Sequence, residues 1–274
     1  MIGLVPAYLC KEHVLSPVGR ARAFKALSAP LSNPKASISW TRFLRSNTLA
    51  RRLVRETPDF AVKPLLKYLN MNYEFADKVR TLLSHYNFVT QEFSEEDIRA
   101  IYFGDGIDLA EFRGKSGTVY RVRLTTYAIC HCEGEMVLKI ETSAGDVICF
   151  AIFSVGSFTD GRRRIELGAI QGARASLDPI VTKVATRDFH SVRPKHLLMA
   201  IFYSFAAHCK IDAILCVTNL FFLCVLRHNY RSRHLRVKMS YIINRNTWRR
   251  KRHKVKGSST DPYGVVERYR DPCE

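Results

Sequence analysis

The sequence predicts an α+β protein, with a helical amino-terminal part followed by an antiparallel or mixed sheet with two helices. Two changes of pattern carry this prediction. Apolar residues recur every three to four positions as far as about residue 103, and from Leu109 they recur at every second position. After Ile170 the helical pattern returns and leads into a short apolar run, Ala213 to Thr218, that suits a central strand. With 274 residues, 47% of them hydrophobic, the chain can bury a substantial core.

The first part of the chain divides into a leader and a helical region. Residues 1–38 carry four prolines among small and basic residues, so we expect a loosely ordered leader. Residues 39–103 form a predicted helical subdomain, in which Asn72 and Ser94 are the expected caps of two helices. The arginines between its apolar positions indicate a solvent-facing side or, alternatively, a phosphate-binding one.

Residues 104–248 form the predicted α+β domain. Short alternating segments separated by glycine-containing turns predict an antiparallel meander of about five strands. Pro179, which follows Asp178, and Pro194 each stand at an expected helix start, because the fixed φ of proline suits the first helical turn. The second of these helices is apolar nearly all round, as buried helices are.

The cysteines give no sign of a metal centre. The eight cysteines are scattered, mostly in apolar runs, and no pair has the C-x-x-C spacing. Such cysteines pack as small hydrophobic residues and are typical of a reducing compartment. Cys130 and Cys132 lack a second pair of ligands at a zinc spacing. We therefore predict no metal site.

The charge of the chain points to an anionic partner. The formal net charge is +18 and the isoelectric point is about 9.8, a balance that attracts nucleic acid, anionic lipid or an acidic cofactor. Residues 249–274 are predicted to be a disordered basic tail. Tyr241 and Trp248, among cations, suit stacking on nucleic-acid bases, but no nucleic-acid-binding fold motif accompanies them. An anionic membrane surface would attract the same cations.

No transmembrane segment is expected. A spanning helix needs roughly 20 apolar residues, and His208, Lys210 and Asp212 interrupt the most apolar region. The opening residues lack the basic start of a secretory signal. We expect a cytoplasmic protein, with a peripheral position at the inner membrane as the alternative.

A ligand site is predicted where the sheet gives way to the last helices. Arg193 and Lys195 flank Pro194 at a helix start, and a helix amino terminus attracts anions through its free N–H groups and its dipole. Gln171 and Gly172 end the preceding strand. The predicted order of elements here is a meander, a loop with glycine and arginine, a buried helix and a further strand. This order resembles the acyl-CoA N-acyltransferase fold.

That resemblance implies acyl-CoA as the cofactor, held by Arg193, Lys195, Gln171 and Gly172, with Gln171 also facing the acceptor. The usual glycine-rich phosphate loop is missing, because the residues just before the helix include no glycine. Without a ligand, the same residues would be a solvated helix start and a strand-ending turn.

Two residues are candidates for catalysis. Asn219 follows a predicted central strand, and ligands gather outside the carboxyl ends of such strands. His190 precedes the buried helix and is either a catalytic base or a hydrogen-bonded structural histidine. We find no serine elbow, no Walker loop and no paired carboxylates, and Glu166 stands alone on its predicted strand.

Several segments together resemble the bacterial VirK/YbjX family over roughly residues 40–219. They are the helix at 82–88 with its His85-Tyr86 pair, the hairpin at 109–117, the strand at 167–173 that ends in Gln171-Gly172, the helix start at 193–198, and the strand end Val217-Thr218-Asn219.

The resemblance implies a Gram-negative bacterial protein linked to virulence and to the cell envelope. Members of the family are associated with outer-membrane remodelling and resistance to antimicrobial peptides, without an established catalytic mechanism. Beyond Asn219 the sequence departs from the family, which usually has histidine where Phe222 stands here. The leading hypothesis is therefore an envelope factor of this family. The alternatives are an acyl-CoA-dependent acyltransferase and a nonenzymatic binder of anionic lipid or nucleic acid.

Overall fold

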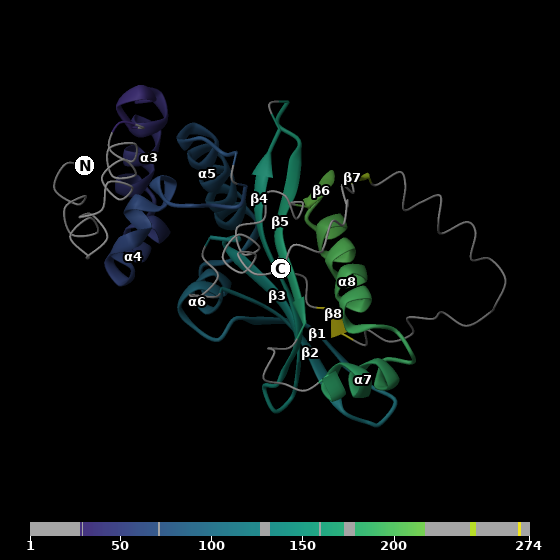
Figure 1. Cartoon of the computed structure of the whole chain (residues 1–274). Helices are drawn as coiled ribbons and strands as arrows, with labels where there is room; N and C mark the ends of the chain where they lie inside the picture. The colour runs from purple at the N-terminus through teal and green to yellow at the C-terminus, as the bar shows by residue number, and fades with distance from the viewer. Residues whose placement is uncertain are drawn as a thin grey trace, which may run out of the picture.

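The computed structural model describes Ser28 and residues 30–70, 72–126, 132–158, 160–172 and 179–216, together with the backbone of 242–244 and 268–269. Helices come first along the chain, then a meander of strands, then two helices and a return to the sheet (Figure 1). The predicted α+β class with a mixed sheet is confirmed.

The amino-terminal part is helical, as predicted. Its elements are α3 (Pro34–Ser46), α4 (Thr48–Glu56), the 3-10 helix η1 (Pro58–Leu65), α5 (Phe75–Glu92) and α6 (Glu95–Phe103). Because Pro34 takes the first helical position, α3 begins inside the range predicted as a loose leader.

The two predicted helix caps have different outcomes. Ser94 caps α6 as predicted, since its side chain accepts a hydrogen bond from the amide of Asp97. The predicted cap at Asn72 is wrong. Glu74 caps α5 instead, in a capping box with Asp77, because a reciprocal pair of side-chain bonds satisfies two backbone N–H groups at once.

The predicted meander of five strands is confirmed. It consists of β1 (Ile107–Arg113), β2 (Val119–Thr125), β3 (Met136–Thr142), β4 (Val147–Ser157) and β5 (Arg163–Gly172), each antiparallel to the next. The strand β6 (Ala213–Cys216) then pairs parallel with β5, as the connection through two helices allows.

Two short strands complete the described sheet. They are β7 (Ile242–Asn244) beside β6 and β8 (Arg268–Tyr269) beside β1, so that the order is β7-β6-β5-β4-β3-β2-β1-β8. The strand β8 falls within the range predicted as a disordered tail. The other residues of that range lie outside the part of the chain that the structure describes.

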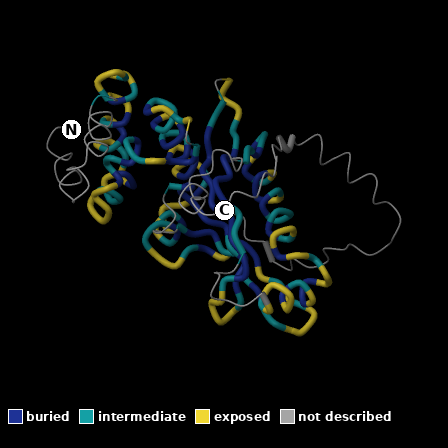
Figure 2. Tube along the Cα trace, viewed as in Figure 1, coloured by how far each residue is buried: buried dark blue, intermediate teal, exposed yellow. Residues whose placement is uncertain are grey.

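Helices α7 (Pro179–Asp188) and α8 (Pro194–His208) lie on the side of the sheet opposite the amino-terminal helices (Figure 1). Phe202 and Phe205 of α8 contact Phe153 of β4 edge-on, with ring centroids 4.9 and 5.7 Å apart. Burial is concentrated in the strands and on the inner sides of the helices (Figure 2). No described helix is both long enough and apolar enough to cross a membrane.

The strand β4 extends beyond its neighbour β3, and α5 covers the edge that this leaves. The pairing of β3 with β4 ends at Met136 opposite Phe153, whereas β4 continues to Ser157. An uncovered strand edge would present unpaired backbone N–H groups. Here the N–H of Val155 donates to Nδ1 of His85 on α5 over 3.1 Å. The helical part is thereby joined to the sheet through polar contacts.

Candidate functional site

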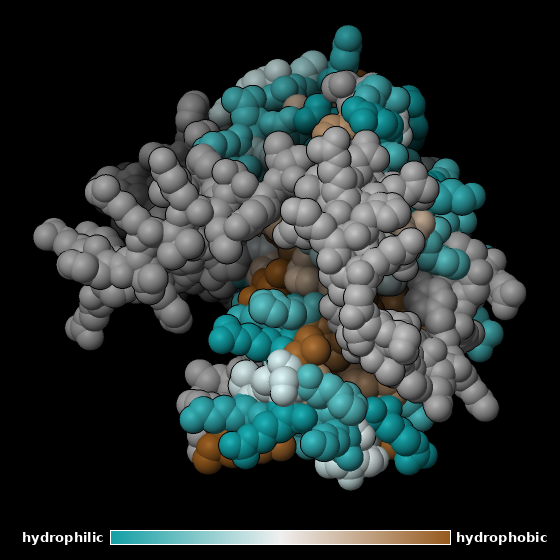
Figure 3. Space-filling view, turned by 90° about the vertical axis from the view of Figure 1, so that its right-hand side faces the viewer, coloured by the Kyte–Doolittle hydropathy of each residue, from teal (hydrophilic) through white to brown (hydrophobic). Residues whose placement is uncertain are grey.

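A pocket of about 750 Å³ lies between the ends of β4 and β5 and the helices α7 and α8. Its described lining residues are Ile148, Cys149, Gly172, Thr182, Lys183, Thr186, Arg187, Arg193, Pro194, Lys195 and His196. Small-molecule sites commonly have volumes of roughly 300–1,000 Å³. Figure 3 faces the side of the molecule that carries α7 and α8, and shows hydrophobic surface set among hydrophilic surface there.

Four cationic side chains converge on this pocket. Lys183 and Arg187 stand one helical turn apart on α7, and Arg193 and Lys195 stand at the start of α8. None of the four has an ion-pair partner among the described residues, and all four are exposed. Unneutralised cations around one pocket favour an anionic ligand.

The start of α8 adds to this electrostatic bias. Pro194 takes the first helical position, and Arg193 precedes it in an extended conformation without a side-chain capping bond. The dipole of a helix amino terminus attracts anions, although Pro194 has no N–H and the His196 amide already donates to the Arg193 carbonyl over 2.8 Å. The Cε atom of Lys195 lies 3.7 Å from the point that a Cβ on Gly172 would occupy, so the lysine side chain passes over the end of β5.

The floor of the pocket is apolar. Ile148 and Cys149 of β4 line it, and Cys149 is buried. Burial raises the pKa of the Cys149 thiol to about 12, although the charge of Lys195 acts in the opposite direction. The thiol is therefore protonated at neutral pH and behaves as apolar lining rather than as a nucleophile.

The structure brings together some of the predicted site residues and separates others. Gly172, Arg193 and Lys195 all line the pocket. Gln171 pairs with Phe150 and, by strand alternation, lies on the opposite face of the sheet from Gly172 and Cys149. His190 stands exposed in the α7–α8 turn with φ of 50°, and it is not among the described residues that line the pocket. Asn219 lies outside the described residues.

Sequence reasoning missed the cations of α7. Lys183 and Arg187 have the i, i+4 spacing that places two side chains on one side of a helix. That spacing, next to the predicted helix start at Pro194, was the available signal. The alternation of the strand likewise indicates that Gln171 and Gly172 face opposite ways.

A second polar cluster lies in the interior and was also missed. Lys63 of η1 and Glu135, just before β3, form an ion pair of 2.6 Å with side chains only 10% and 3% exposed. The hydroxyl of Tyr86 donates to the other carboxylate oxygen over 2.5 Å. Ser154 accepts from the Glu135 amide and hydrogen-bonds to Tyr68. These five residues join η1, α5 and the sheet.

Charge compensation holds Glu135 ionised. Burial, the largest single cause, raises the pKa of the Glu135 carboxyl. The charge of Lys63, the neighbouring His85 and the hydrogen bonds from Lys63 and Tyr86 together outweigh it, so the pKa lies below its ordinary value. Burial raises the pKa of the Tyr86 hydroxyl well above its ordinary value, and the charge of Glu135 adds to that rise. The Glu135 carboxylate is thus ionised, and Tyr86 is a neutral donor.

His85, next to Tyr86 on α5, is a neutral histidine in a fixed tautomer. Its Nδ1 accepts from the N–H of Val155, so in the neutral ring Nε2 carries the hydrogen and donates to the Tyr102 hydroxyl 2.8 Å away. Burial lowers the pKa of His85 to about 4. The His-Tyr pair that carried part of the family resemblance therefore lies in the core, where it holds α5 to β4.

Glu166, the single carboxylate of its strand, is paired with a cation and a tyrosine. Arg164 approaches its Oε1 to 2.7 Å, and the hydroxyl of Tyr73 donates to its Oε2 over 2.7 Å. Tyr73, from the turn before α5, thus adds a hydrogen bond to the Arg164–Glu166 ion pair, although it is far from both residues in the sequence. In the part of the chain that the structure describes, no group of three or more His, Cys, Asp or Glu residues could hold a metal ion.

Residues 19–242 match the model of a family described as "Protein of unknown function (DUF535)". The match covers more than half of the chain. The chain belongs to the DUF535 family. This assignment confirms the resemblance to VirK/YbjX proteins.

A DUF535 relative supports the same conclusion. The chain is similar to the uncharacterised protein YbjX of Escherichia coli strain K12, with 26% identity over 214 residues. The alignment covers 78% of this chain and 63% of YbjX, so the chain spans less than two thirds of the length of that relative. The matched range includes α7, α8 and the cationic pocket between them.

Proposed function

We propose that the chain binds a phosphorylated ligand of the coenzyme A class in the α7–α8 pocket, as an acyl-CoA-dependent acyltransferase would. The observation that carries the proposal is the convergence of four cations, Lys183, Arg187, Arg193 and Lys195, on one pocket with an apolar floor. None of them has an ion-pair partner within the described part of the chain.

The two halves of the pocket suit the two halves of such a ligand. The guanidinium groups of Arg187 and Arg193 can each donate two hydrogen bonds to a phosphate group, and Lys183 and Lys195 supply further positive charge. Ile148 and Cys149 on the floor suit an apolar arm of the ligand. A free phosphate or a sugar phosphate would use the cations but leave this floor unfilled.

The chemistry that this site supports is binding and orientation rather than covalent catalysis. The Cys149 thiol is protonated, so the floor offers no nucleophile, and the imidazole of His196 lines the rim. An acyl group held over the floor would pass directly to a hydroxyl or amine of an acceptor bound at the mouth. The C–S bond of the thioester would break as the new C–O or C–N bond forms, and the acceptor's proton would go to the leaving coenzyme A thiolate. The VirK/YbjX relationship suggests an acceptor in the cell envelope.

Calorimetry on the full chain tests this proposal. We expect coenzyme A and palmitoyl-CoA to bind, and pantetheine, which lacks phosphate, to bind much more weakly. Arg193→Ala and Lys195→Ala should each weaken CoA binding about tenfold, since a hydrogen bond to a charged group contributes roughly 1.5–3 kcal/mol. Binding should also weaken as ionic strength rises.

Arg99→Ala is the matched control, because Arg99 on α6 is an exposed cation outside the pocket. It should leave CoA binding unchanged. Absence of CoA binding by the folded protein, or an equal loss in Arg99→Ala, would contradict the proposal. Equal binding of inorganic phosphate alone would reduce the site to a general anion site.

A further inference from the structure

Helix α3 presents an exposed face of cationic and apolar side chains that the α7–α8 pocket does not involve. Lys35, Ile38, Arg42 and Arg45 follow one another at helical spacing, and all four are exposed. Leu31, just ahead of the helix, is 82% exposed and Ile38 is 58% exposed. Exposed apolar side chains next to cations suit contact with an amphipathic partner.

Contacts on the opposite side of α3 keep this face turned toward the solvent. Trp40 and Phe43 are buried against the helical core, with Trp40 stacked on Phe43 and tilted against Phe60. The indole N–H of Trp40 donates to the carbonyl of Ala61 over 2.8 Å. Because these contacts anchor α3, its exposed face keeps one orientation relative to the body of the protein.

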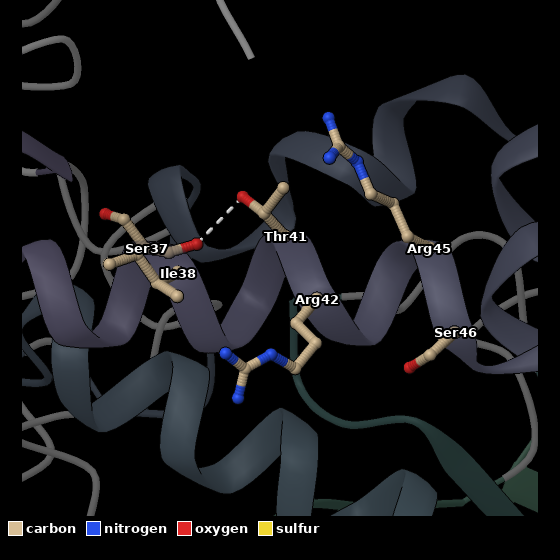
Figure 4. A pocket seen from close by; sticks show the side chains of 6 residues that line it. All are labelled: Ser37, Ile38, Thr41, Arg42, Arg45 and Ser46. Atoms are coloured by element: carbon tan, nitrogen blue, oxygen red, sulfur yellow. Dashed lines mark hydrogen bonds between the residues drawn. The ribbon is translucent and has the colours of Figure 1, made fainter.

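A shallow hollow of about 490 Å³ runs along this face. Its described lining residues all belong to α3 and include Ile38, Arg42 and Arg45 (Figure 4). In Figure 4 the two arginine side chains extend away from the helix axis, and the dashed line marks the bond from the Thr41 hydroxyl to the Ser37 carbonyl. In this view the guanidinium group of Arg45 points upward and that of Arg42 points downward, so the two flank the helix on either side.

The stretch of sequence that carries this face has only positive charges. Between Glu12 and Glu56 the sequence has nine lysines and arginines and no acidic residue. Glu56, the first acid after α3, is already paired with Arg52 at 2.9 Å. Lys35, Arg42 and Arg45 have no ion-pair partner among the described residues. The chain immediately before α3 carries Arg20, Arg22 and Lys25, so it would add to the positive charge and not neutralise it.

We infer that this α3 face docks the protein on an anionic membrane surface, with Arg42 and Arg45 against lipid phosphates and Leu31 and Ile38 inserted among the acyl chains. Interfacial helices combine apolar side chains with lysine and arginine in this way. A nucleic-acid backbone would use the cations but would gain nothing from the exposed leucine and isoleucine, so the lipid surface fits the face better.

Vesicle co-sedimentation of the full chain tests the inference. We expect binding to vesicles that contain phosphatidylglycerol and no binding to pure phosphatidylcholine vesicles. Each cation near an anionic surface contributes a factor of about five in affinity. Arg42→Gln/Arg45→Gln should therefore weaken binding about 25-fold, and Ile38→Ser should weaken it as well.

Arg99→Gln/Arg113→Gln is the control, since it removes the same charge from two exposed positions outside α3. It should bind anionic vesicles like the unaltered protein, and circular dichroism should show all variants folded. An equal loss in this control, or binding to phosphatidylcholine, would overturn the inference. The inference would also be overturned if duplex DNA competed with the vesicles and the Ile38→Ser variant bound the vesicles normally. The face would then be a nucleic-acid-binding surface. CoA binding by these variants stays a separate measurement, so the two proposals can fail independently.

Discussion

Lys63 of η1 and Glu135, the residue just before β3, form a buried ion pair. The Nζ atom of Lys63 and the Oε1 atom of Glu135 are 2.6 Å apart. The pair joins the helical part of the chain to the sheet, and the Tyr86 hydroxyl completes it from α5. Removing one partner of such a pair leaves an uncompensated charge in the interior, which costs more than the intact pair contributes.

We therefore expect Glu135→Gln to lower the free energy of unfolding by about 3–5 kcal/mol. Glu56→Gln is the control, since it breaks the exposed pair with Arg52, in which both side chains are more than 40% exposed. Its effect should be about 0.5 kcal/mol or less. Urea denaturation followed by circular dichroism measures both. A loss below 1 kcal/mol for Glu135→Gln would show that Lys63 finds water or another partner.

The stability of the protein should fall as the pH drops from 6.5 to about 4, because of His85. Burial lowers its folded-state pKa to about 4, whereas the unfolded chain has the ordinary value of 6.5. Between these values the unfolded state binds the extra proton, so acidification favours unfolding, by an amount on the order of 3 kcal/mol. Urea midpoints at the two ends of this window measure the effect.

His85→Asn isolates this contribution. The asparagine side-chain oxygen can still accept from the Val155 amide, but it does not titrate. The variant should be less stable at neutral pH and should lose most of the pH dependence in the same window. If the pH dependence of the stability were unchanged in this variant, it would arise from the titration of other groups.

Gly168 of β5 should tolerate no side chain. A Cβ there would lie 1.8 Å from the carbonyl oxygen of Glu133, a backbone atom that cannot move aside. We expect Gly168→Ala to destabilise the protein by about 3 kcal/mol or more, since overpacking commonly costs roughly 1–3 kcal/mol. Gly172→Ala, on the same strand, is the control, because its nearest contact would be 3.7 Å away. Thermal unfolding measures both variants. Equal melting temperatures would show that the backbone accommodates a Cβ at position 168.

Asp188, at the end of α7, should hold the β1–β2 hairpin in place. Its carboxylate accepts from the Ser116 amide over 2.5 Å and from the Tyr120 hydroxyl over 2.6 Å. Asp188→Ala leaves both donors unsatisfied and should cost about 2–3 kcal/mol. Hydrogen exchange at the Ser116 amide should accelerate, whereas Tyr120→Phe should leave that amide protected. Slow exchange in Asp188→Ala would show that the hairpin is held by other contacts.

Much of the architecture was determined by local sequence. The change of apolar period near Leu109 located the meander, the hydroxyl of Ser94 located the start of α6, and Pro194 located the start of α8. These signals work because they act within a few residues, through strand alternation, backbone capping and the fixed φ of proline. The positive charge of the chain, and with it the hypothesis of an anion site at Arg193 and Lys195, could likewise be drawn from the sequence.

Only the tertiary structure decided which distant residues meet. Lys63, His85 and Glu135 lie far apart in the sequence and share no motif. The charge of Glu135 and the tautomer of His85 affect the stability of the fold only because these residues are buried. The same holds for the pocket, where α7 folds back and adds Lys183 and Arg187 to the predicted helix start. Sequence spacing specifies which way a side chain points from its own element, whereas the meeting of elements depends on how β4 and β5 pair and which face each helix covers.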